Sequence, residues 1–197
     1  MKKMYTHSLL YVLLFLTSVA CGQTNNSTSL NENTLNNRSE TKVDTPGLQF
    51  TESQYLNLGE KYSDQGRYAE AVKLFSEIIR INPNNLRAYL KRATCYQEMA
   101  FFSKAIKDLR LVLEKDKDNP LAYNNLGSVF FDKKAPLKAL EFLNKAIKIS
   151  PNYSRAYYNR GYVYNDLGQK DKACTDWKKG GDLGDFDCKE MLAKYCK

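Results

Sequence analysis

The sequence repeats itself every 34 residues, and this period constrains the fold more than any other feature. Aromatic, small and apolar positions return in register through four consecutive units between residues 52 and 185. The five clearest columns are Tyr55, Tyr89, Tyr123 and Tyr157; Gly59, Ala93, Gly127 and Gly161; Tyr62, Tyr96, Phe130 and Tyr164; Ala71, Ala105, Ala139 and Ala173; and Phe75, Leu109, Leu143 and Trp177. A unit of this length cannot bury a core alone, so the units must stack and share one.

Each unit contains two stretches with the periodicity of amphipathic helices. In the first unit, apolar or small residues recur at i, i+3, i+4 and i+7 between Tyr55 and Tyr62, which places them on one helix face. Ala71 and Phe75 form an i, i+4 pair in the second stretch. The small residue in the Gly59 column lets two helices approach closely, so each unit is predicted to be a helix hairpin.

The residues between these helices follow the same period. Gly66 and Gly168 stand where the first helix of a unit ends, a position that favours glycine because the backbone turns left-handed there. Ala100 and Lys134 replace this glycine in the second and third units, which weakens those turns without abolishing them. Pro136 stands early in a second helix, where its missing N–H costs little. The hairpin is therefore expected in all four units.

The period and the residue types resemble those of the tetratricopeptide repeat (TPR), and the fourth unit, with the run YYNRGYVYNDLGQKDKAC, closely resembles a common variant of that family. The resemblance covers residues 52–185. It implies an all-α fold, a right-handed superhelical stack of four helix hairpins with units at about 52–85, 86–119, 120–153 and 154–185. Residues 186–197 carry one apolar stripe at helical spacing and are predicted to form a capping helix, which completes a TPR domain at 51–197.

The N-terminal 20 residues have the pattern of an export signal. Two lysines precede a mostly apolar stretch over 8–19, which is too short to span a bilayer comfortably. The run from Ser18 to Cys21 resembles a bacterial lipoprotein signal, in which the cysteine is acylated and becomes the first residue of the mature protein, although Ser18 replaces the usual leucine. Residues 1–20 are thus expected to be a lipoprotein signal peptide. Ordinary cleavage after Ala20, which would leave a soluble product, is the alternative.

Residues 21–50 are dominated by Asn, Ser, Thr and Glu and show no apolar periodicity. Such a segment cannot bury enough apolar surface to offset its ordering entropy, so it is predicted to be a flexible linker that carries the lipid on Cys21. The expected location is the bacterial cell envelope, where acyl chains would hold the protein on a membrane, facing the periplasm.

Four cysteines follow Cys21, and an exported chain meets an oxidising compartment in which disulfides form. Cys174 begins the last second helix and Cys196 ends the predicted cap. If these helices run antiparallel, the two residues lie within about 3 Å along the axis, whereas Cys188 misses Cys174 by roughly 9 Å. A Cys174–Cys196 disulfide is therefore expected, with buried free thiols as the alternative. Cys95 and Cys188 are expected to pack in the core.

The chain lacks the groups that most catalytic and metal sites need. Its single histidine, His7, lies inside the predicted signal, which leaves no histidine for a triad or a metal site in the mature chain. The sequence contains no glycine-rich phosphate loop. Asp185 and Asp187 are paired carboxylates, but a place at a helix start suits capping. We expect no catalytic residue, no metal, no cofactor and no small-molecule substrate; a carboxylate-based cell-wall hydrolase is the less favoured alternative.

The formal net charge of +8 raises the question of nucleic-acid binding. Lys2 and Lys3 belong to the predicted signal, and the other basic residues are interspersed with Asp and Glu. A surface that binds phosphates would cluster them, so an ordinary solvated surface and no nucleic-acid partner are expected.

The resemblance also implies where a partner would bind, because fixed positions of the first helices line a concave groove in TPR proteins. Carried over by position, the candidate groove residues are Leu56 and Glu60 in unit one; Arg87, Leu90, Lys91, Thr94 and Gln97 in unit two; Asn124, Asn125, Ser128 and Phe131 in unit three; and Arg155, Tyr158, Asn159, Tyr162 and Asn165 in unit four. One TPR subgroup grips acidic chaperone tails with a basic residue and an asparagine where this chain has Leu56 and Glu60, which argues against that ligand. Arg87 with Lys91, one helical turn apart, could still hold a single carboxylate.

This mixture of basic, amide and aromatic groups suits an extended or helical peptide. The expected function is a non-enzymatic protein–protein interaction module or scaffold of the bacterial cell envelope, whose partner is a protein or peptide. An accessory lipoprotein of outer-membrane assembly, of a pilus or of an export machinery is the alternative.

Overall fold

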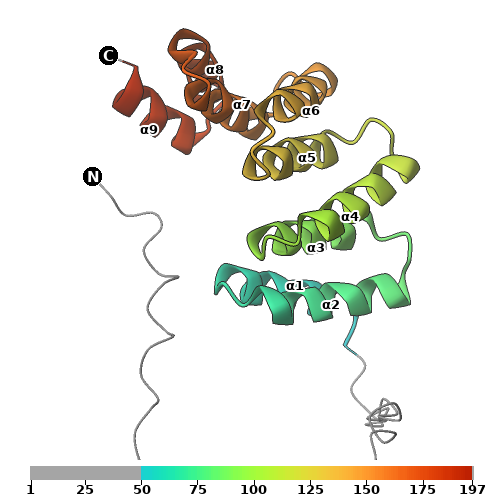
Figure 1. The fold of residues 1–197 in the computed structure, drawn as a ribbon. Coiled ribbons are helices and arrows are strands. Elements are labelled where there is room, and N and C mark those ends of the chain that lie inside the picture. The colour runs from blue at the N-terminus through green and yellow to red at the C-terminus, as the bar shows by residue number, and fades with distance from the viewer. Residues whose placement is uncertain (1–49, 197) are drawn as a thin grey trace, which may run out of the picture. The chain divides into compact units, whose positions relative to one another are not determined.

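The computed structural model describes residues 50–196, and every regular element in that part of the chain is an α-helix (Figure 1). The helices are α1 (Glu52–Asp64), α2 (Tyr68–Ile81), α3 (Leu86–Glu98), α4 (Phe102–Lys115), α5 (Pro120–Asp132), α6 (Pro136–Ile149), α7 (Ser154–Asp166), α8 (Lys170–Asp182) and α9 (Phe186–Tyr195). The predicted all-α stack of four hairpins with a capping helix is confirmed. The predicted signal peptide, Cys21 and nearly all of the predicted linker lie outside the described residues.

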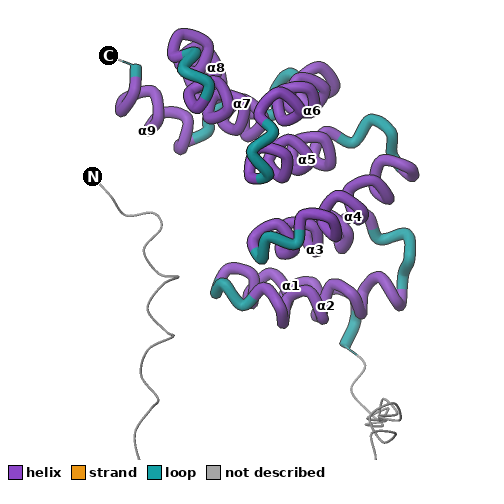
Figure 2. Tube along the Cα trace, viewed as in Figure 1, coloured by secondary structure: helices purple, strands orange, loops and turns teal. Residues whose placement is uncertain are grey.

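Short turns close each hairpin, and slightly longer loops join one hairpin to the next (Figure 2). Each second helix packs on the first helix of the following unit, and the first helices α1, α3, α5 and α7 also contact their neighbours in the row. The buried apolar residues form four clusters, all within 55–196. This part of the chain therefore has a hydrophobic core of its own.

Two of the sequence columns meet inside each hairpin. Gly59 of α1 lies against the Phe75 ring of α2 so closely that a Cβ on Gly59 would stand 2.6 Å from Phe75 Cε1. The same pairing recurs in later units: Gly127 with Leu143, and Gly161 with Trp177. Phe75, Leu143 and Trp177 are fully buried. The column of Gly59 holds small residues because the large side chains in the column of Phe75, on the second helix of the hairpin, fill the space beside them.

Side-chain caps start most of the first helices. Thr51 forms a capping box with Gln54, and Asn85 and Asn119 accept a backbone N–H in the first turns of α3 and α5. These residues share the column that Tyr153 occupies before α7, where no side-chain cap is present. Because a cap satisfies an otherwise unpaired N–H, it helps to fix where the first three hairpins begin.

The turns inside the hairpins are left-handed at the residue after the helix cap, as the sequence predicts. Gly66 and Gly168 have φ of 73° and 72°, and Ala100 and Lys134 adopt 59° at the equivalent positions. The backbone N–H groups of the left-handed residue and of the residue after it point back into the ended helix; in the first hairpin, Gly66 N–H donates to the Ser63 carbonyl and Arg67 N–H to the Tyr62 carbonyl. The two non-glycine residues are therefore strained by the turn that they occupy.

Lys134→Gly should raise the free energy of unfolding by about 1 kcal/mol, since it relieves a left-handed residue that costs about 1–2 kcal/mol at the expense of some added chain entropy. The matched control is Lys133→Gly, one residue earlier, where φ is −71° and glycine brings only the entropy cost. Chemical denaturation of both variants measures the difference. Equal stability of the two would show that the left-handed turn is not strained.

Two buried ion pairs were not predicted from the sequence. The Arg92 guanidinium on α3 donates to both carboxylate oxygens of Asp108 on α4, at 2.8 and 2.9 Å. Arg160 on α7 pairs with Asp176 on α8 in the same way, at 2.7 Å for both bonds. Each arginine also reaches back to a polar side chain of the preceding hairpin, Ser76 or Asn144. These arginines therefore tie the second unit to the first and the fourth to the third.

The ion pairs alternate with apolar pairs along the stack. Positions equivalent to Arg160 and Asp176 hold Leu126 and Phe142 in the third unit and Leu58 and Leu74 in the first. The aromatic residues around these positions fit either pair. Arg160 lies over Tyr157 and Tyr164, at 5.6 and 5.8 Å, whereas Phe142 stacks on the equivalent Tyr123 and Phe130. The space beside these two aromatic residues thus accommodates either a guanidinium group or a phenyl ring.

The last helix, α9, closes the open end of the stack. Its Cys188 and Met191 are buried in a cluster with Trp177, which covers the apolar surface that a fifth hairpin would otherwise cover. It ends at Tyr195, slightly before the predicted limit of 197. Cys174 and Cys196 form a disulfide between α8 and the end of α9, with Cα atoms 5.7 Å apart, so the pair selected by axial spacing is the pair that the structure links.

Cys95 and Cys188 are free thiols buried in the core, as predicted. Burial, reinforced by the neighbouring Asp185 carboxylate, raises the pKa of Cys188 to about 12. A thiol with such a pKa carries almost no thiolate at neutral pH and is a poor nucleophile. Both residues therefore act as small apolar side chains.

Candidate functional site

The predicted groove residues lie on the first helix of each hairpin: α1, α3, α5 and α7. We call the surface formed by the side chains of α1, α3, α5 and α7 at these positions the first-helix face. Its residues fall into three groups: a charged group on α1 and α3, an amide group in the middle, and an aromatic group beside α9.

The charged group is already paired within the chain. Arg87 Nη2 and Lys91 Nζ on α3 lie 2.9 and 2.8 Å from the same carboxylate oxygen of Glu60 on α1. The hydrogen bond from Lys91, followed by that from Arg87, holds the pKa of Glu60 below its usual value, against the opposing effect of partial burial. The sequence suggests that Arg87 and Lys91 could hold a single carboxylate. In the structure, that carboxylate is Glu60 of the same chain.

Because folding lowers the pKa of Glu60, the stability from this cluster is present above the unfolded-state pKa of about 4.3 and is lost as pH falls through the folded value. We expect Glu60→Gln to lower the unfolding midpoint at pH 7 and to have a smaller effect near pH 3, where more of the Glu60 carboxyl is protonated. Denaturation curves at both pH values test this, with Glu77→Gln, an exposed glutamate on α2, as the control. A difference of equal size at both pH values would contradict an electrostatic origin.

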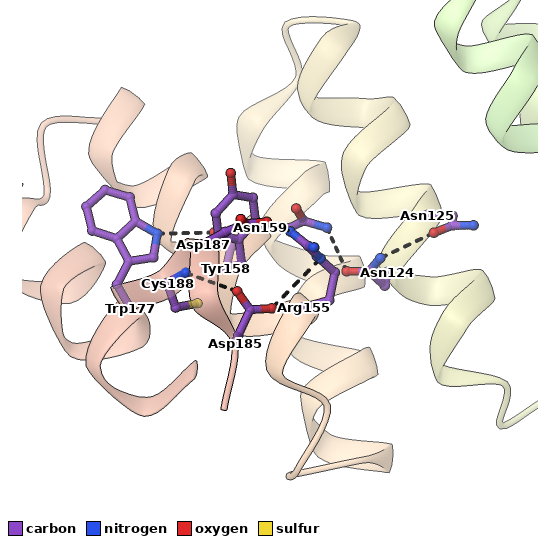
Figure 3. Close-up of polar contacts among 9 residues, drawn as sticks. All are labelled: Asn124, Asn125, Arg155, Tyr158, Asn159, Trp177, Asp185, Asp187 and Cys188. Carbon is purple, nitrogen blue, oxygen red and sulfur yellow. Dashed lines mark hydrogen bonds and ion pairs between the residues drawn. The ribbon is translucent and has the colours of Figure 1, made fainter. Parts of the chain in front are cut away.

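The middle of the face is a chain of side-chain amides. Asn159 Nδ2 on α7 donates to Asn124 Oδ1 on α5 at 2.8 Å, and Asn124 Nδ2 donates to Asn125 Oδ1 at 3.2 Å (Figure 3). Asn124 is only 4% exposed, so it joins two hairpins and is a poor candidate for direct contact with a partner. Between α3 and α5, the Gln97 amide donates to Ser128 at 2.8 Å and to Asp132, at the end of α5.

The aromatic group is built jointly by α7 and α9. Arg155 lies 4.8 Å above the Tyr158 ring and pairs with Asp187 of α9 at 2.7 Å (Figure 3). The rings of Tyr158 and Tyr162 are 4.9 Å apart, and the Tyr162 hydroxyl donates to Met191 Sδ of α9. Desolvation is the largest cause that raises the pKa of Tyr158, which keeps its phenol protonated. The capping helix therefore also shapes the candidate site.

This contribution of α9 was not foreseen. Asp185 does cap α9, as predicted, by accepting the Cys188 N–H at 3.0 Å. Asp187 also lies in the first turn of α9, but its carboxylate reaches across to Arg155 (Figure 3). No sequence signal links these residues, because the contact depends on the angle at which α9 meets α7.

The remaining candidates differ in accessibility. Leu90 and Phe131 are partly buried and pack against core clusters. Thr94 is exposed, and its hydroxyl donates to the Leu90 carbonyl within α3. Thr94, with the half-buried Asn125 and Asn159, is therefore better placed to meet a partner than Leu90 and Phe131.

Two properties of the described part of the chain bear on the site. Between residues 50 and 196, no cluster of three or more His, Cys, Asp or Glu side chains is placed to hold a metal ion. None of the helices in the same range is both long and apolar enough to cross a bilayer.

Profiles of the tetratricopeptide repeat match residues 62–127, 121–153 and 142–175. Among curated proteins, Hsp70-Hsp90 organizing protein 3 of Arabidopsis thaliana is 46% identical over 41 residues, which is 21% of this chain. The match spans only 7% of that much longer protein. The similarity is thus confined to about one repeat.

Solved structures share the fold over most of the chain. A thermophilic TPR protein of Thermus thermophilus superposes with a TM-score of 0.68 at 24% identity, covering 74% of this chain and 81% of that one. MamA gives 0.55 at 26% identity (70% and 82%), and PilF of Pseudomonas aeruginosa gives 0.63 at 22% identity (73% and 67%). Tetratricopeptide repeats are therefore clearly present in this chain, and its fold is a TPR superhelix.

Proposed function

We propose that this protein is a non-enzymatic scaffold of the bacterial cell envelope that holds a segment of another protein on the first-helix face. The repeat fold supports a protein–protein interaction scaffold. The observation that carries the proposal is the unused hydrogen-bonding capacity in the middle of the face. Within the described chain, Asn125 accepts one side-chain hydrogen bond and Asn159 donates one, whereas an amide offers two donors and two acceptor lone pairs.

These amides suit a polypeptide backbone, which presents alternating N–H and C=O groups that an asparagine can pair with simultaneously. Beside them, Tyr158 and Tyr162 offer ring faces for an apolar or aromatic side chain. At the opposite end, Glu60 already pairs with Arg87 and Lys91, so an acidic segment would have to compete with Glu60 for these two cations. The proposed ligand is an extended, uncharged segment with an apolar residue towards the α7 end.

Selection of a random peptide library against the chain from residue 22 onward tests this proposal. We expect enriched peptides to lose about tenfold in affinity when Asn125→Ala removes one or two hydrogen bonds. Asn152→Ala is the matched control, because Asn152 is an exposed asparagine in the loop before α7. Peptides that bind both variants equally, or a failure to enrich any peptide, would refute binding at this face.

The envelope location is a separate part of the proposal and rests on the lipoprotein-like sequence that ends at Cys21. We expect the native chain to fractionate with membranes and to carry an acylated Cys21, and Cys21→Ala to release it. Mass analysis of the N-terminus together with fractionation provides the test. A soluble native chain would refute the anchor and leave the peptide-binding proposal intact.

A further inference from the structure

One edge of the stack carries exposed apolar side chains among lysines. Leu137, near the start of α6, is 74% exposed, and Phe101, just before α4, is 51% exposed. Both follow the left-handed turn of their hairpin, at Lys134 and at Ala100 respectively. These two turns lie at the same end of consecutive hairpins (Figure 2), and residues of both line one hollow of the surface.

Four exposed lysines stand within four residues of Phe101 or Leu137 in the sequence: Lys104, Lys133, Lys134 and Lys138. Lys104 Nζ lies 5.0 Å from the Phe101 ring centre, and Lys133 Nζ lies 5.6 Å from that of Phe102. A shallow hollow between the two turns is lined by residues 100–104 and Lys133. We call this surface, residues 100–104 with 133–138, the turn edge.

Acidic groups do not cancel this charge. Glu98 and Asp132 end the two neighbouring first helices, and Asp132 accepts a hydrogen bond from Gln97 at 2.6 Å. Four lysines against these two carboxylates leave the turn edge positive. The outer hairpins lack the apolar part, since Arg67 and Gln169 stand at the position of Phe101, and Ala69 and Asp171 at that of Leu137.

We propose that the turn edge docks on an anionic lipid surface, with Phe101 and Leu137 entering the interface and the lysines meeting acidic headgroups. Apolar side chains that insert shallowly beside lysines whose charges stay in the headgroup region are the general pattern of peripheral membrane binding. The inference extends the proposed function, because a chain anchored at Cys21 would be held close to such a surface. Docking by this edge would orient the first-helix face relative to the membrane.

Vesicle co-sedimentation tests the proposal with the chain from residue 22 onward, which contains all four core clusters but not Cys21. We expect binding to vesicles of phosphatidylcholine with phosphatidylglycerol, weak binding to phosphatidylcholine alone, and a decline with added salt. A lysine near an anionic surface contributes about fivefold in partitioning, so the double variant Lys133→Gln, Lys134→Gln should bind at least tenfold more weakly.

The apolar contribution is tested in the same assay by Phe101→Ser with Leu137→Ser, again with an expected loss of at least tenfold. The matched controls are Phe186→Ser, an apolar residue 75% exposed on α9, and Lys148→Gln with Lys179→Gln, near the opposite ends of α6 and α8. Absence of binding to anionic vesicles, or equal loss in the controls, would overturn the proposal. Because the assay uses neither Cys21 nor Asn125, its failure is distinct from failure of the proposed anchor or of peptide binding.

Discussion

Asp176→Ala should lower the free energy of unfolding by about 3–4 kcal/mol, because it leaves the Arg160 guanidinium unpaired in a largely buried site. The side chain of Asp176 is 6% exposed and that of Arg160 is 19% exposed, so water compensates only in part for the lost carboxylate. The two hydrogen bonds lost, at 2.7 Å each, join α7 to α8. Chemical denaturation of the native chain and the variant measures the effect.

The chain itself supplies the control for this prediction. The double variant Arg160→Leu, Asp176→Phe copies the pair at Leu126 and Phe142 into the fourth unit, where Tyr157 and Tyr164 can pack against the new ring as Tyr123 and Phe130 do in the third. We expect the double variant to lie within about 1 kcal/mol of the native chain, since replacing a buried ion pair by packed apolar groups is often neutral. A double variant that is less stable than Asp176→Ala would show that the ion pair and the apolar pair cannot replace each other at these positions.

Loss of the Cys174–Cys196 disulfide should cost about 3 kcal/mol, because the two cysteines are 22 residues apart and the bond restricts the unfolded chain. We expect the double variant Cys174→Ser, Cys196→Ser to unfold at lower denaturant concentration and the amides of α9 to exchange faster than those of α1. A reducing agent should have the same effect on the native chain and none on the variant. A native chain indifferent to reduction would contradict a stabilising disulfide.

The same variant tests whether α9 belongs to the binding site. Asp187 holds Arg155 and Met191 accepts the Tyr162 hydroxyl, so a loosened α9 would disturb the aromatic group as well as the end of the stack. We therefore expect selected peptides to bind the double serine variant more weakly, while Cys95→Ala, at a buried thiol of the second unit, leaves the affinity unchanged.

The fold could be predicted from the sequence because the residues that each hairpin needs recur at the same positions in all four units. The column of Gly59 faces the column of Phe75, and the left-handed turns fall at Gly66 and its equivalents. Even the disulfide followed from counting residues along two antiparallel helices. These properties depend on contacts inside one hairpin or between adjacent helices, for which the sequence spacing is a sufficient guide.

The candidate site was less accessible to sequence reasoning, because its contacts join different hairpins. The carboxylate of Glu60 reaches Arg87 and Lys91 only through the angle between α1 and α3, and Asp187 reaches Arg155 only through the placement of α9. The alternation of ion pairs and apolar pairs was visible as Arg and Asp returning after two units. A pair that returns only in every second unit breaks the column of like residues, so the period of 34 residues does not reveal it.

The most direct test of the central claim is photo-crosslinking in cells that make the protein. A photoreactive phenylalanine analogue replaces either Thr94, exposed on the first-helix face, or Lys107, exposed on α4. If the first-helix face holds a segment of another protein, Thr94 yields a discrete crosslinked protein that Lys107 does not, and Asn125→Ala weakens it. Absence of a crosslink at Thr94, or the same products from both positions, would contradict the proposed binding face.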